Sequence, residues 1–246
     1  MGLFQRRSPR DGKVRAVSGR VAIVIPALNE QDALPHVLGD IQAALEAEVV
    51  VVDNRSTDQT AEVARNGGAT VLYEPQRGYG AACLRGINYL AEGDAPPDVL
   101  VILDGDHADD PSVLPADFVE PILRDEVDLV LSTRREQAEP GSMSAVQLWG
   151  NTLQTTLLRA RFGLQLTDMG PMRAIRFSTL LELAMEDRTW GWNVEMACKA
   201  ARNNLRIREV PVSYRNRIGE SKISGTMSGV VRAGGKILYA FAKYGR

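Results

Sequence analysis

Short apolar runs rich in valine and isoleucine alternate with helix-like segments over the first 135 residues of the chain. The runs predict strands, at 21–28, 48–53, 69–74, 99–104 and 128–133. The segments between these runs have the spacing of helices, at 31–46, 57–66, 79–92 and 112–125. Runs that are apolar on both faces and separated by helices are typical of a parallel sheet covered on both sides. We therefore expect an α/β fold with a mostly parallel sheet flanked by helices.

The pattern changes after about residue 135 to longer helices and little strand. It predicts helices at 144–162, 178–186 and 192–202, one β-like stretch at 206–215 and a C-terminal helix at 226–244. Ser56 or Thr57 can cap the second helix of the chain, and Asp110 followed by Pro111 can start the fourth. These elements divide the chain into a basic N-terminal tail (1–19), one domain (20–225) and an amphipathic C-terminal helix (226–246).

Composition and charge limit the classes of function. The 246 residues are 44% hydrophobic, enough for a substantial core, and the net charge of -2 argues against nucleic acid as the main partner. Both chain ends are basic: residues 1–20 hold six lysines and arginines against one acid, and residues 221–246 hold five against none. Such ends are either solvated tails or contacts for an anionic membrane surface. The apolar positions of the C-terminal helix suit the membrane interface and packing against the domain equally well.

Cysteine use and the lack of long apolar stretches bear on the compartment. Cys83 and Cys198 lie in helix-like patterns without metal-ligand spacing, which favours small core residues in a reducing compartment. The sequence shows neither the continuous apolar segment of a signal peptide nor the roughly 18 apolar residues of a membrane span. We expect a cytoplasmic protein, or one bound peripherally to the cytoplasmic face of a membrane.

Acidic residues follow several of the predicted strands, at the edge where open parallel sheets bind ligands. Asp104 and Asp106 stand two residues apart, so an extended backbone points both carboxylates to one side. Two carboxylates there repel each other unless a cation lies between them, and hard oxygen ligands favour Mg²⁺ or Mn²⁺ over Zn²⁺. The alternative is that Asp104 ends a strand and Asp106 makes a turn. Asp109 and Asp110 fit a solvated loop and a helix cap better than metal ligands.

Several ordered motifs resemble one known family. They read VIPALNE, VVDNRSTDQTAEVA, RGYGAACLRGI, LDGDHADDP, TDMGPMRAI, WGWNVEMACKA and EVPVSYRNRIGESKISGT. Together they resemble the family 2 glycosyltransferases of the GT-A fold, close to the branch that transfers mannose or glucose to polyprenyl (dolichyl) phosphate. The resemblance covers about residues 20–225 and implies a Rossmann-like GT-A fold with a C-terminal helical extension. It also implies inverting transfer of a hexose from a nucleotide-diphosphate sugar, of the UDP-glucose or GDP-mannose type, to a polyprenyl phosphate.

The resemblance assigns roles to residues at the strand ends. The nucleotide-sugar-binding residues that it implies are Pro26, Leu28, Glu30, Asp53, Asp58, Arg77, Gly80 and Asp104. It implies Asp106 as the direct ligand of a Mg²⁺ or Mn²⁺ cofactor. Mannosyl members often carry a glutamine two residues later, where this chain has Ala108. Either water or a neighbour such as His107 then completes the metal shell, or metal binding is weaker than in that branch.

The second half of the chain supplies the acceptor side in this reading. The catalytic residues that the resemblance implies are Asp104, Asp106, Asp168, Arg173 and Glu195. The residues implied for binding the acceptor or a phosphate are Arg134, Arg215, Arg217, Ser221 and Lys222, with Arg135 beside them. Arginine suits phosphate because its planar fork binds two oxygens at once. The alternative for these bases is surface ion pairing with acids such as Glu209 and Glu220, and packing is favoured over sugar stacking for Trp190 and Trp192.

The nature of the acceptor decides whether the reaction needs a general base. A lipid phosphate arrives anionic and needs none, whereas a hydroxyl acceptor requires a carboxylate such as Asp168 or Glu195 to take its proton. A soluble hydroxyl acceptor and a non-catalytic sugar-nucleotide-binding protein remain alternatives. A nicotinamide-dependent dehydrogenase is disfavoured because its glycine-rich loop should follow the first strand, where this chain reads PALNEQ. The sequence leaves open the sugar, the base of the donor and the oligomeric state.

Overall fold

The seven strands described in the computed structural model form one sheet, in the order β3-β2-β1-β4-β6-β5-β7. The structure describes residues 19–219 and 227–245, with the side chains of the last helix from residue 234 onward. The strands are β1 (Val21–Ala27), β2 (Glu48–Asp53), β3 (Thr70–Tyr73), β4 (Val99–Ile102), β5 (Leu129–Thr133), β6 (Arg173–Arg176) and β7 (Ile207–Pro211). Neighbours run parallel, except that β6 is antiparallel to both β4 and β5. The expected α/β fold with a mostly parallel sheet is confirmed.

Strand β6 is the one that the hydrophobic pattern does not predict. It has four residues with an arginine at each end, and Arg173 is buried. So short a strand, beginning with a buried charge, contains no apolar run for the pattern to detect. The β-like stretch at 206–215 is also shorter than expected, since β7 ends at Pro211. The five other predicted strands are present; β2 has its predicted bounds, and β1, β3, β4 and β5 are shorter by one or two residues.

Most helices lie close to their predicted ranges. They are α1 (Leu34–Ala44), α2 (Thr60–Asn66), α3 (Tyr79–Glu92), α5 (Ala145–Phe162), α6 (Phe177–Glu182), α7 (Trp192–Arg202) and α8 (Met227–Tyr244). The prediction of one helix at 112–125 is wrong. That segment is a 3₁₀ turn η1 (Pro111–Val113), a π-helical stretch η2 (Leu114–Val119) and a short helix α4 (Glu120–Leu123). Pro115 and Pro121 lack the amide hydrogens that a continuous α-helix needs, so the segment divides at them.

One of the two predicted helix caps is present. The Asp110 carboxylate accepts a backbone N–H of η1 at 3.1 Å, as expected. The cap predicted for α2 is wrong, because α2 begins at residue 60 and has no side-chain cap. Instead, the Ser56 hydroxyl accepts the amide of Asn29 at 2.9 Å, and the Thr57 amide donates to the Asn29 side chain at 2.8 Å. These two residues therefore hold the loop after β1 against the loop after β2.

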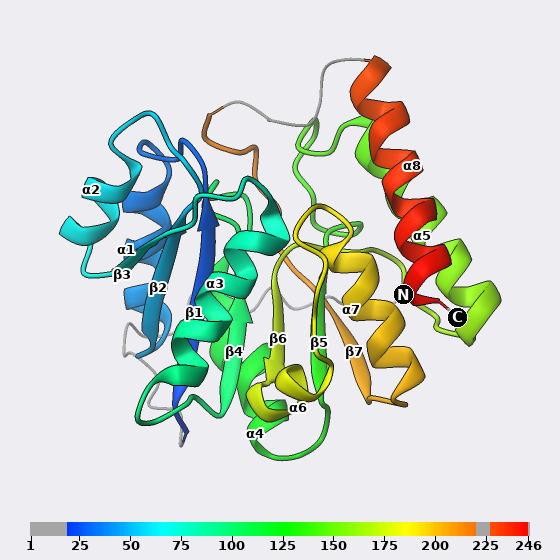
Figure 1. Ribbon diagram of the computed structural model, residues 1–246, viewed down its shortest axis with the longest axis horizontal. Coiled ribbons are helices and arrows are strands. Elements are labelled where there is room, and N and C mark those ends of the chain that lie inside the picture. The colour runs from blue at the N-terminus through cyan, green and yellow to red at the C-terminus, as the bar shows by residue number, and fades with distance from the viewer. Residues whose placement is uncertain (1–18, 220–226, 246) are drawn as a thin grey trace, which may run out of the picture.

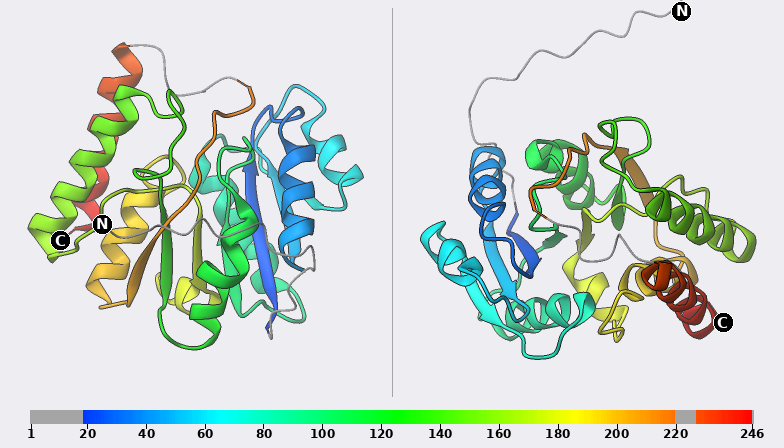
Figure 2. Two further views of the ribbon diagram at one scale, coloured as in Figure 1. Left: turned by 180° about the vertical axis from the view of Figure 1, so that it is seen from behind. Right: turned by 90° about the horizontal axis from the view of Figure 1, so that it is seen from above.

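Two hydrophobic layers cover the sheet, because successive strand residues point to opposite faces. On one face, α1, α2, η2 and α4 pack against residues such as Ile23 and Ile25. On the other face, α3, α6 and α7 pack against residues such as Val24 and Val52. Figure 1 shows α3 and α7 in front of the sheet, and the view from behind in Figure 2 shows α1 on the far side. The sheet is thus covered by helices on both faces.

Helix α8 is the predicted C-terminal helix, and it packs on α7 and α5 (Figures 1 and 2). Its described side chains at Ile237, Ala240 and Tyr244 are buried, whereas Leu238 and Tyr239 are exposed. Packing therefore accounts for one face of the helix and leaves the other open. No helix among the described residues is long and apolar enough to cross a membrane. Residues 1–18 of the predicted basic tail lie outside the described residues.

Buried side chains confirm three smaller predictions. Trp192 is fully buried in the core, which supports packing over sugar stacking for this residue, while Trp190 remains 45% exposed. Cys83 and Cys198 are both free and buried. They act as small core residues, as their spacing indicates.

Candidate functional site

The carboxyl ends of β1, β2 and β4 meet at one edge of the sheet (Figure 1). Asp53 ends β2 opposite Ala27 of β1, and its carboxylate accepts the Ser56 amide at 2.9 Å. Pro26, Leu28 and Glu30 lie in and just after β1, partly buried, so the structure brings these implied nucleotide-binding residues together. Asp58 lies beside them, and its carboxylate accepts hydrogen bonds from the amide and the hydroxyl of Thr60, the first residue of α2. Burial opposes ionisation of Asp58, but hydrogen bonds from Thr60 and neighbouring amides hold its pKa below the ordinary value.

Asn54 is a residue of this edge that sequence reasoning missed. Its side-chain amide donates to the carbonyl oxygens of Glu74 at 3.0 Å and Gln76 at 2.7 Å, and its side-chain oxygen accepts the Gly78 amide at 2.8 Å. One buried side chain therefore shapes the whole loop after β3, which carries the exposed Arg77. Its place directly after Asp53, at the end of a buried strand, was the signal available in the sequence.

The first turn of α3 lies against the 186–189 loop. The amides of Gly80 and Ala81 donate to the carbonyl oxygens of Thr189 at 3.2 Å and Arg188 at 3.0 Å. A Cβ atom at Gly80 would lie 1.9 Å from the Asp187 carbonyl oxygen. Gly80 therefore permits a close approach of two backbone segments. Its own amide is already used within the protein.

The predicted acid pair lies in the loop after β4, where some buried carboxylate oxygens have no hydrogen-bond donor among the described residues. Asp106 is 4% exposed; its Oδ1 accepts the Ala108 amide at 3.0 Å and its Oδ2 pairs with Arg217. Asp104 Oδ1 is buried and has no hydrogen-bond partner within the described residues. Burial, together with the charge of Asp106, raises the pKa of Asp104 to about 6. Oδ1 of Asp104 is thus a buried acceptor that no donor in the described part of the chain satisfies.

Asp109 extends the same acidic loop. It is 4% exposed, and neither of its carboxylate oxygens has a partner within the described residues. Burial and the charges of Asp104 and Asp106 raise the pKa of Asp109 well above the ordinary value. The interpretation of Asp109 as a solvated loop residue is therefore wrong, because a backbone bridge to Tyr214 covers it. Asp110, by contrast, is the helix cap that the sequence predicts.

The loop fits a hard divalent cation, since its buried carboxylate oxygens lack hydrogen-bond donors. No group of three or more histidine, cysteine, aspartate or glutamate side chains among the described residues could hold a metal alone. Donor phosphates and water would therefore complete the shell that Ala108 leaves short. The His107 ring does not face the pair: its Nε2 lies 3.0 Å from Asp40 Oδ2 on α1 and 2.9 Å from Arg215 Nη1.

Arg173 lies below this loop at the start of β6 and is buried. Its guanidinium donates to the carbonyl oxygens of Gly170 at 2.7 Å and Pro171 at 3.1 Å. Burial lowers the pKa of Arg173, and the charge of nearby Asp104 opposes that shift. Arg173 thus supplies positive charge to the acid pair from the protein interior while it fixes the 170–171 turn.

Asp168 and Arg134 form a buried ion pair. Arg134 Nε lies 2.7 Å from Asp168 Oδ2, and Nη2 lies 2.9 Å from Oδ1. The amides of Arg134 and Met169 donate to the same carboxylate. Burial opposes its ionisation, but these contacts hold the pKa of Asp168 below the ordinary value. Both oxygens are occupied, so this geometry favours a structural tie between the loops after β5 and before β6 over a general base.

Glu195 is similarly occupied. Its carboxylate, fully buried in the first turn of α7, accepts the amides of Glu186 at 2.8 Å and Asp187 at 2.7 Å, and it pairs with Lys199 at 2.7 Å. Glu195 therefore holds the same 186–189 loop that covers the start of α3. This placement favours a positioning role over proton transfer.

The segment after β7 runs along the acidic loop. The Arg215 amide donates to the Ala108 carbonyl at 2.8 Å, and the Ile218 amide donates to the Asp106 carbonyl at 3.0 Å. Arg217, which the resemblance implies for phosphate binding, pairs with Asp106 of the acid pair, whereas the Arg215 side chain pairs with Asp40 at 3.1 Å. Arg135 lies apart from these residues, against Thr152 of α5. Ser221 and Lys222 lie outside the described residues.

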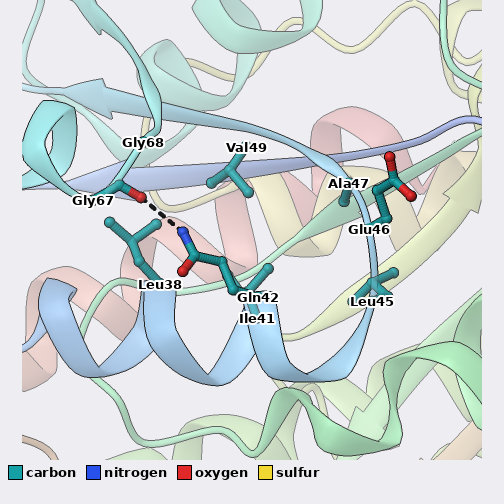
Figure 3. A pocket seen from close by; sticks show the side chains of 9 residues that line it. All are labelled: Leu38, Ile41, Gln42, Leu45, Glu46, Ala47, Val49, Gly67 and Gly68. Atoms are coloured by element: carbon teal, nitrogen blue, oxygen red, sulfur yellow. Dashed lines mark hydrogen bonds between the residues drawn. The ribbon is translucent and has the colours of Figure 1, made fainter. Parts of the chain in front are cut away.

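A separate pocket has neither residue of the acid pair in its lining (Figure 3). It is formed between the last turns of α1 and α2 and the start of β2, and its lining includes Leu38, Gln42 and Val49. The Gln42 side chain crosses it to donate to the Gly67 carbonyl at 2.9 Å (Figure 3). The amino end of β2 lies at the opposite edge of the sheet from Asp53. This pocket therefore contains none of the implied site residues.

Comparison with known proteins agrees with this architecture. Residues 22–183 match the family model described as glycosyl transferase family 2. A glycosyltransferase of Mycobacterium tuberculosis, named as uncharacterised, is 38% identical over 214 residues, covering 87% of this chain and 94% of the relative. The undecaprenyl-phosphate mannosyltransferase of Micrococcus luteus is 34% identical over 227 residues, covering 85% and 90%. The dolichyl-phosphate hexose transferase of Haloferax volcanii is 33% identical over 206 residues, covering 82% and 86%.

Solved structures support the same fold. Glucosyl-3-phosphoglycerate synthase from Mycobacterium tuberculosis, crystallised with Mn²⁺, UDP-glucose and phosphoglyceric acid, matches with a TM-score of 0.71. The match covers 93% of this chain and 80% of that one at 19% identity, which bears on the fold alone. The sequence motifs, the sheet topology and the match over residues 22–183 agree, and the chain belongs to glycosyltransferase family 2, with the GT-A fold.

Proposed function

We propose that this enzyme transfers a hexose, with inversion, from a nucleotide-diphosphate sugar to a polyprenyl phosphate, with Mg²⁺ or Mn²⁺ as cofactor. The observation that carries the proposal is the acidic loop after β4, where Asp106 lies buried beside Arg217 and the buried Oδ1 of Asp104 has no hydrogen-bond partner within the described residues. A divalent cation there would neutralise the diphosphate of the donor as it leaves. Donors of the UDP-glucose and GDP-mannose types both suit this chemistry.

The residues of the neighbouring loops provide position and charge. Asp53 and Asn54 hold the loops that would surround the nucleotide, and the exposed Arg77 would meet its phosphates. Arg173 adds buried positive charge beneath Asp104. Lys222 and Ser221 are proposed to bind phosphate on the basis of the family resemblance alone.

The state of the candidate bases favours an anionic acceptor. All carboxylate oxygens of Asp168 and Glu195 already accept hydrogen bonds from the protein. A hydroxyl acceptor needs a free base to take its proton, whereas a phosphate acceptor is already ionised at neutral pH. Two relatives bear names with undecaprenyl phosphate or dolichyl phosphate, which supports the same acceptor class.

A soluble acceptor is the second candidate. It is favoured by the structural neighbours, which were crystallised with phosphoglyceric acid. Their identity of 19–20% and the occupied carboxylates make this candidate the weaker one. Phosphoglyceric acid would react through a hydroxyl group and would therefore need a base, and the carboxylate oxygens of Asp168 and Glu195 are already occupied.

A transfer assay distinguishes the two acceptors. Labelled UDP-glucose and GDP-mannose would each be incubated with Mn²⁺ and either a short polyprenyl phosphate or 3-phosphoglycerate, with products identified by mass spectrometry. We expect product with the polyprenyl phosphate, and a loss of about a hundredfold or more in Asp106→Asn. The exposed Asp94→Asn is the matched control and should retain full activity. Product from 3-phosphoglycerate alone would reject the lipid acceptor and leave the family assignment standing.

A further inference from the structure

The two arginines of the 215–217 segment have different surroundings. Arg215 is held by three side chains: Asp40 Oδ2 at 3.1 Å, His107 Nε2 at 2.9 Å and Asp110 Oδ1 at 3.6 Å. The contacts of Arg215 tie the segment to α1 and to both sides of the acidic loop. They explain why this part of the chain lies where it does, whatever Arg217 contacts.

Arg217 instead points to the acid pair itself. Its guanidinium pairs with Oδ2 of Asp106, and its side chain is partly exposed. Oδ1 of the same carboxylate already accepts the Ala108 amide. The oxygen that Arg217 neutralises is therefore the one with the least commitment to the protein backbone, and the one most available to a cation.

We propose that Arg217 is an exchangeable counter-ion of Asp106, which a divalent cation must displace, while Arg215 stays in place as the anchor of the segment. This inference rests on the metal role in the proposed function, and it is independent of the acceptor. Two positive charges cannot share Oδ2 at contact distance without repelling each other. The displaced guanidinium remains tethered beside the cation, where the donor diphosphate offers it a new anion.

The exchange has a measurable consequence for metal affinity. A ligand binds more weakly when the competent state is only a fraction of the population, and the apparent dissociation constant rises by the inverse of that fraction. If Arg217 occupies Asp106 for about nine-tenths of the time, removing it should tighten cation binding about tenfold. An arginine that only added catalytic charge would have no such effect on the free enzyme.

The test measures Mn²⁺ binding to the metal-free full chain, with free Mn²⁺ followed by electron paramagnetic resonance and no nucleotide present. Arg217→Gln should bind Mn²⁺ about tenfold more tightly than the wild type, and Asp106→Asn should lose this site. Arg135→Gln removes the same charge from a residue that does not hold the segment of Arg217 in place, and it should not tighten binding, which controls for net charge. Arg217→Lys keeps a charge with weaker pairing and should lie between wild type and Arg217→Gln. Circular dichroism melts check that each variant is folded.

The outcomes distinguish the exchange at Arg217 from the metal role in the proposed function. Unchanged or weaker Mn²⁺ binding in Arg217→Gln would overturn the exchange while leaving the metal role intact. Equal tightening in Arg135→Gln would also overturn it, because the effect would then be one of net charge. Absence of Mn²⁺ binding in every protein, including the wild type, would reject the exchange together with the metal role in the proposed function.

Discussion

At the scale of single residues, the acidic loop keeps buried carboxylate oxygens that no donor among the described residues satisfies. Asp104 is the clearest case, because its buried Oδ1 has no partner within the described residues and its pKa is raised to about 6. In the unfolded chain an aspartate has its ordinary pKa of 3.8. Folding at pH 7 therefore requires the Asp104 carboxylate to stay ionised in a site that disfavours the charge. This lowers the free energy of unfolding in exchange for a functional group.

Asp104→Asn should therefore stabilise the metal-free protein while abolishing transfer. We expect a gain of about 1–3 kcal/mol in the free energy of unfolding at pH 7, because the variant carries no charge to bury. The difference should shrink as the pH falls from 6 to 4, since the folded wild type takes up its proton first. Urea denaturation in EDTA at several pH values measures this, with Asp94→Asn as control. A destabilised variant at pH 7 would contradict the account of Asp104.

Asp168 presents the opposite case, a buried charge that is fully compensated. Asp168→Ala should cost about 3–5 kcal/mol of stability, because it leaves the Arg134 guanidinium buried without its partner. The exposed pair of Arg208 and Glu126 is the control, and Glu126→Ala should change stability by less than about 1 kcal/mol. Thermal and urea unfolding give both values. If Asp168→Ala kept full stability and lost only its catalytic rate, Asp168 would be a base after all.

At the scale of elements, the 186–189 loop links three helices. Glu195 of α7 accepts two of its amides, the start of α3 donates to its carbonyl oxygens, and Lys243 of α8 pairs with Glu186 at 2.7 Å. A single loop thus sets the position of α3, whose first turn borders the loop that carries Arg77. The close approach at Gly80 is what allows this arrangement.

Gly80→Ala should separate these segments. The added Cβ would meet a backbone carbonyl oxygen, which cannot rotate away, so we expect a loss of about 1–3 kcal/mol and weaker donor binding. Gly39→Ala on α1 is the matched control, because its Cβ would meet nothing within 4 Å. That variant should gain up to about 1 kcal/mol through helix propensity. Equal effects of the two substitutions on stability would argue against the loop contact.

At the scale of the whole molecule, exposed apolar side chains lie on the paired helices α5 and α8. Trp149 is 52% and Tyr239 62% exposed, and Leu148 and Leu238 accompany them. The two helices lie side by side at one end of the molecule (Figures 1 and 2). An enzyme that acts on a lipid phosphate needs contact with a membrane, and aromatic side chains on amphipathic helices suit the interface. We propose this surface as the peripheral contact.

Co-sedimentation with anionic liposomes tests the proposed membrane contact. The full chain should bind at low salt and less at high salt, because the surface field falls off within a Debye length. Trp149→Ser combined with Tyr239→Ser should weaken binding, whereas Tyr73→Ser should not. Tyr73 is 58% exposed and lies on the edge strand β3, away from both helices. Loss of binding in both proteins, or in neither, would reject this surface as the contact.

Local patterns in the sequence determined most of the strands and helices, the acid pair after β4 and the family. Five strands and the place of Asp104 and Asp106 follow from apolar runs and the polar residues that end them, because each signal lies within about ten residues of chain. Pro115 and Pro121 are possible helix breaks in the sequence. The helical spacing of the residues around them nevertheless predicted one continuous helix.

The tertiary structure alone decided which charges meet. Asp106 and Arg217 are 111 positions apart in the sequence, and Arg215 and Asp40 are 175 apart. The sequence spacing of neither pair predicts the contact. The same holds for Asp168 and Glu195, whose occupied oxygens favour structural roles although their residue type suits a base. The chemical type of a side chain is known from the sequence, but its burial and its partner depend on segments that folding brings together. The sequence did not predict β6 for the same reason: Arg173 at its start is buried because β4 and β5 pair with the strand on its two sides.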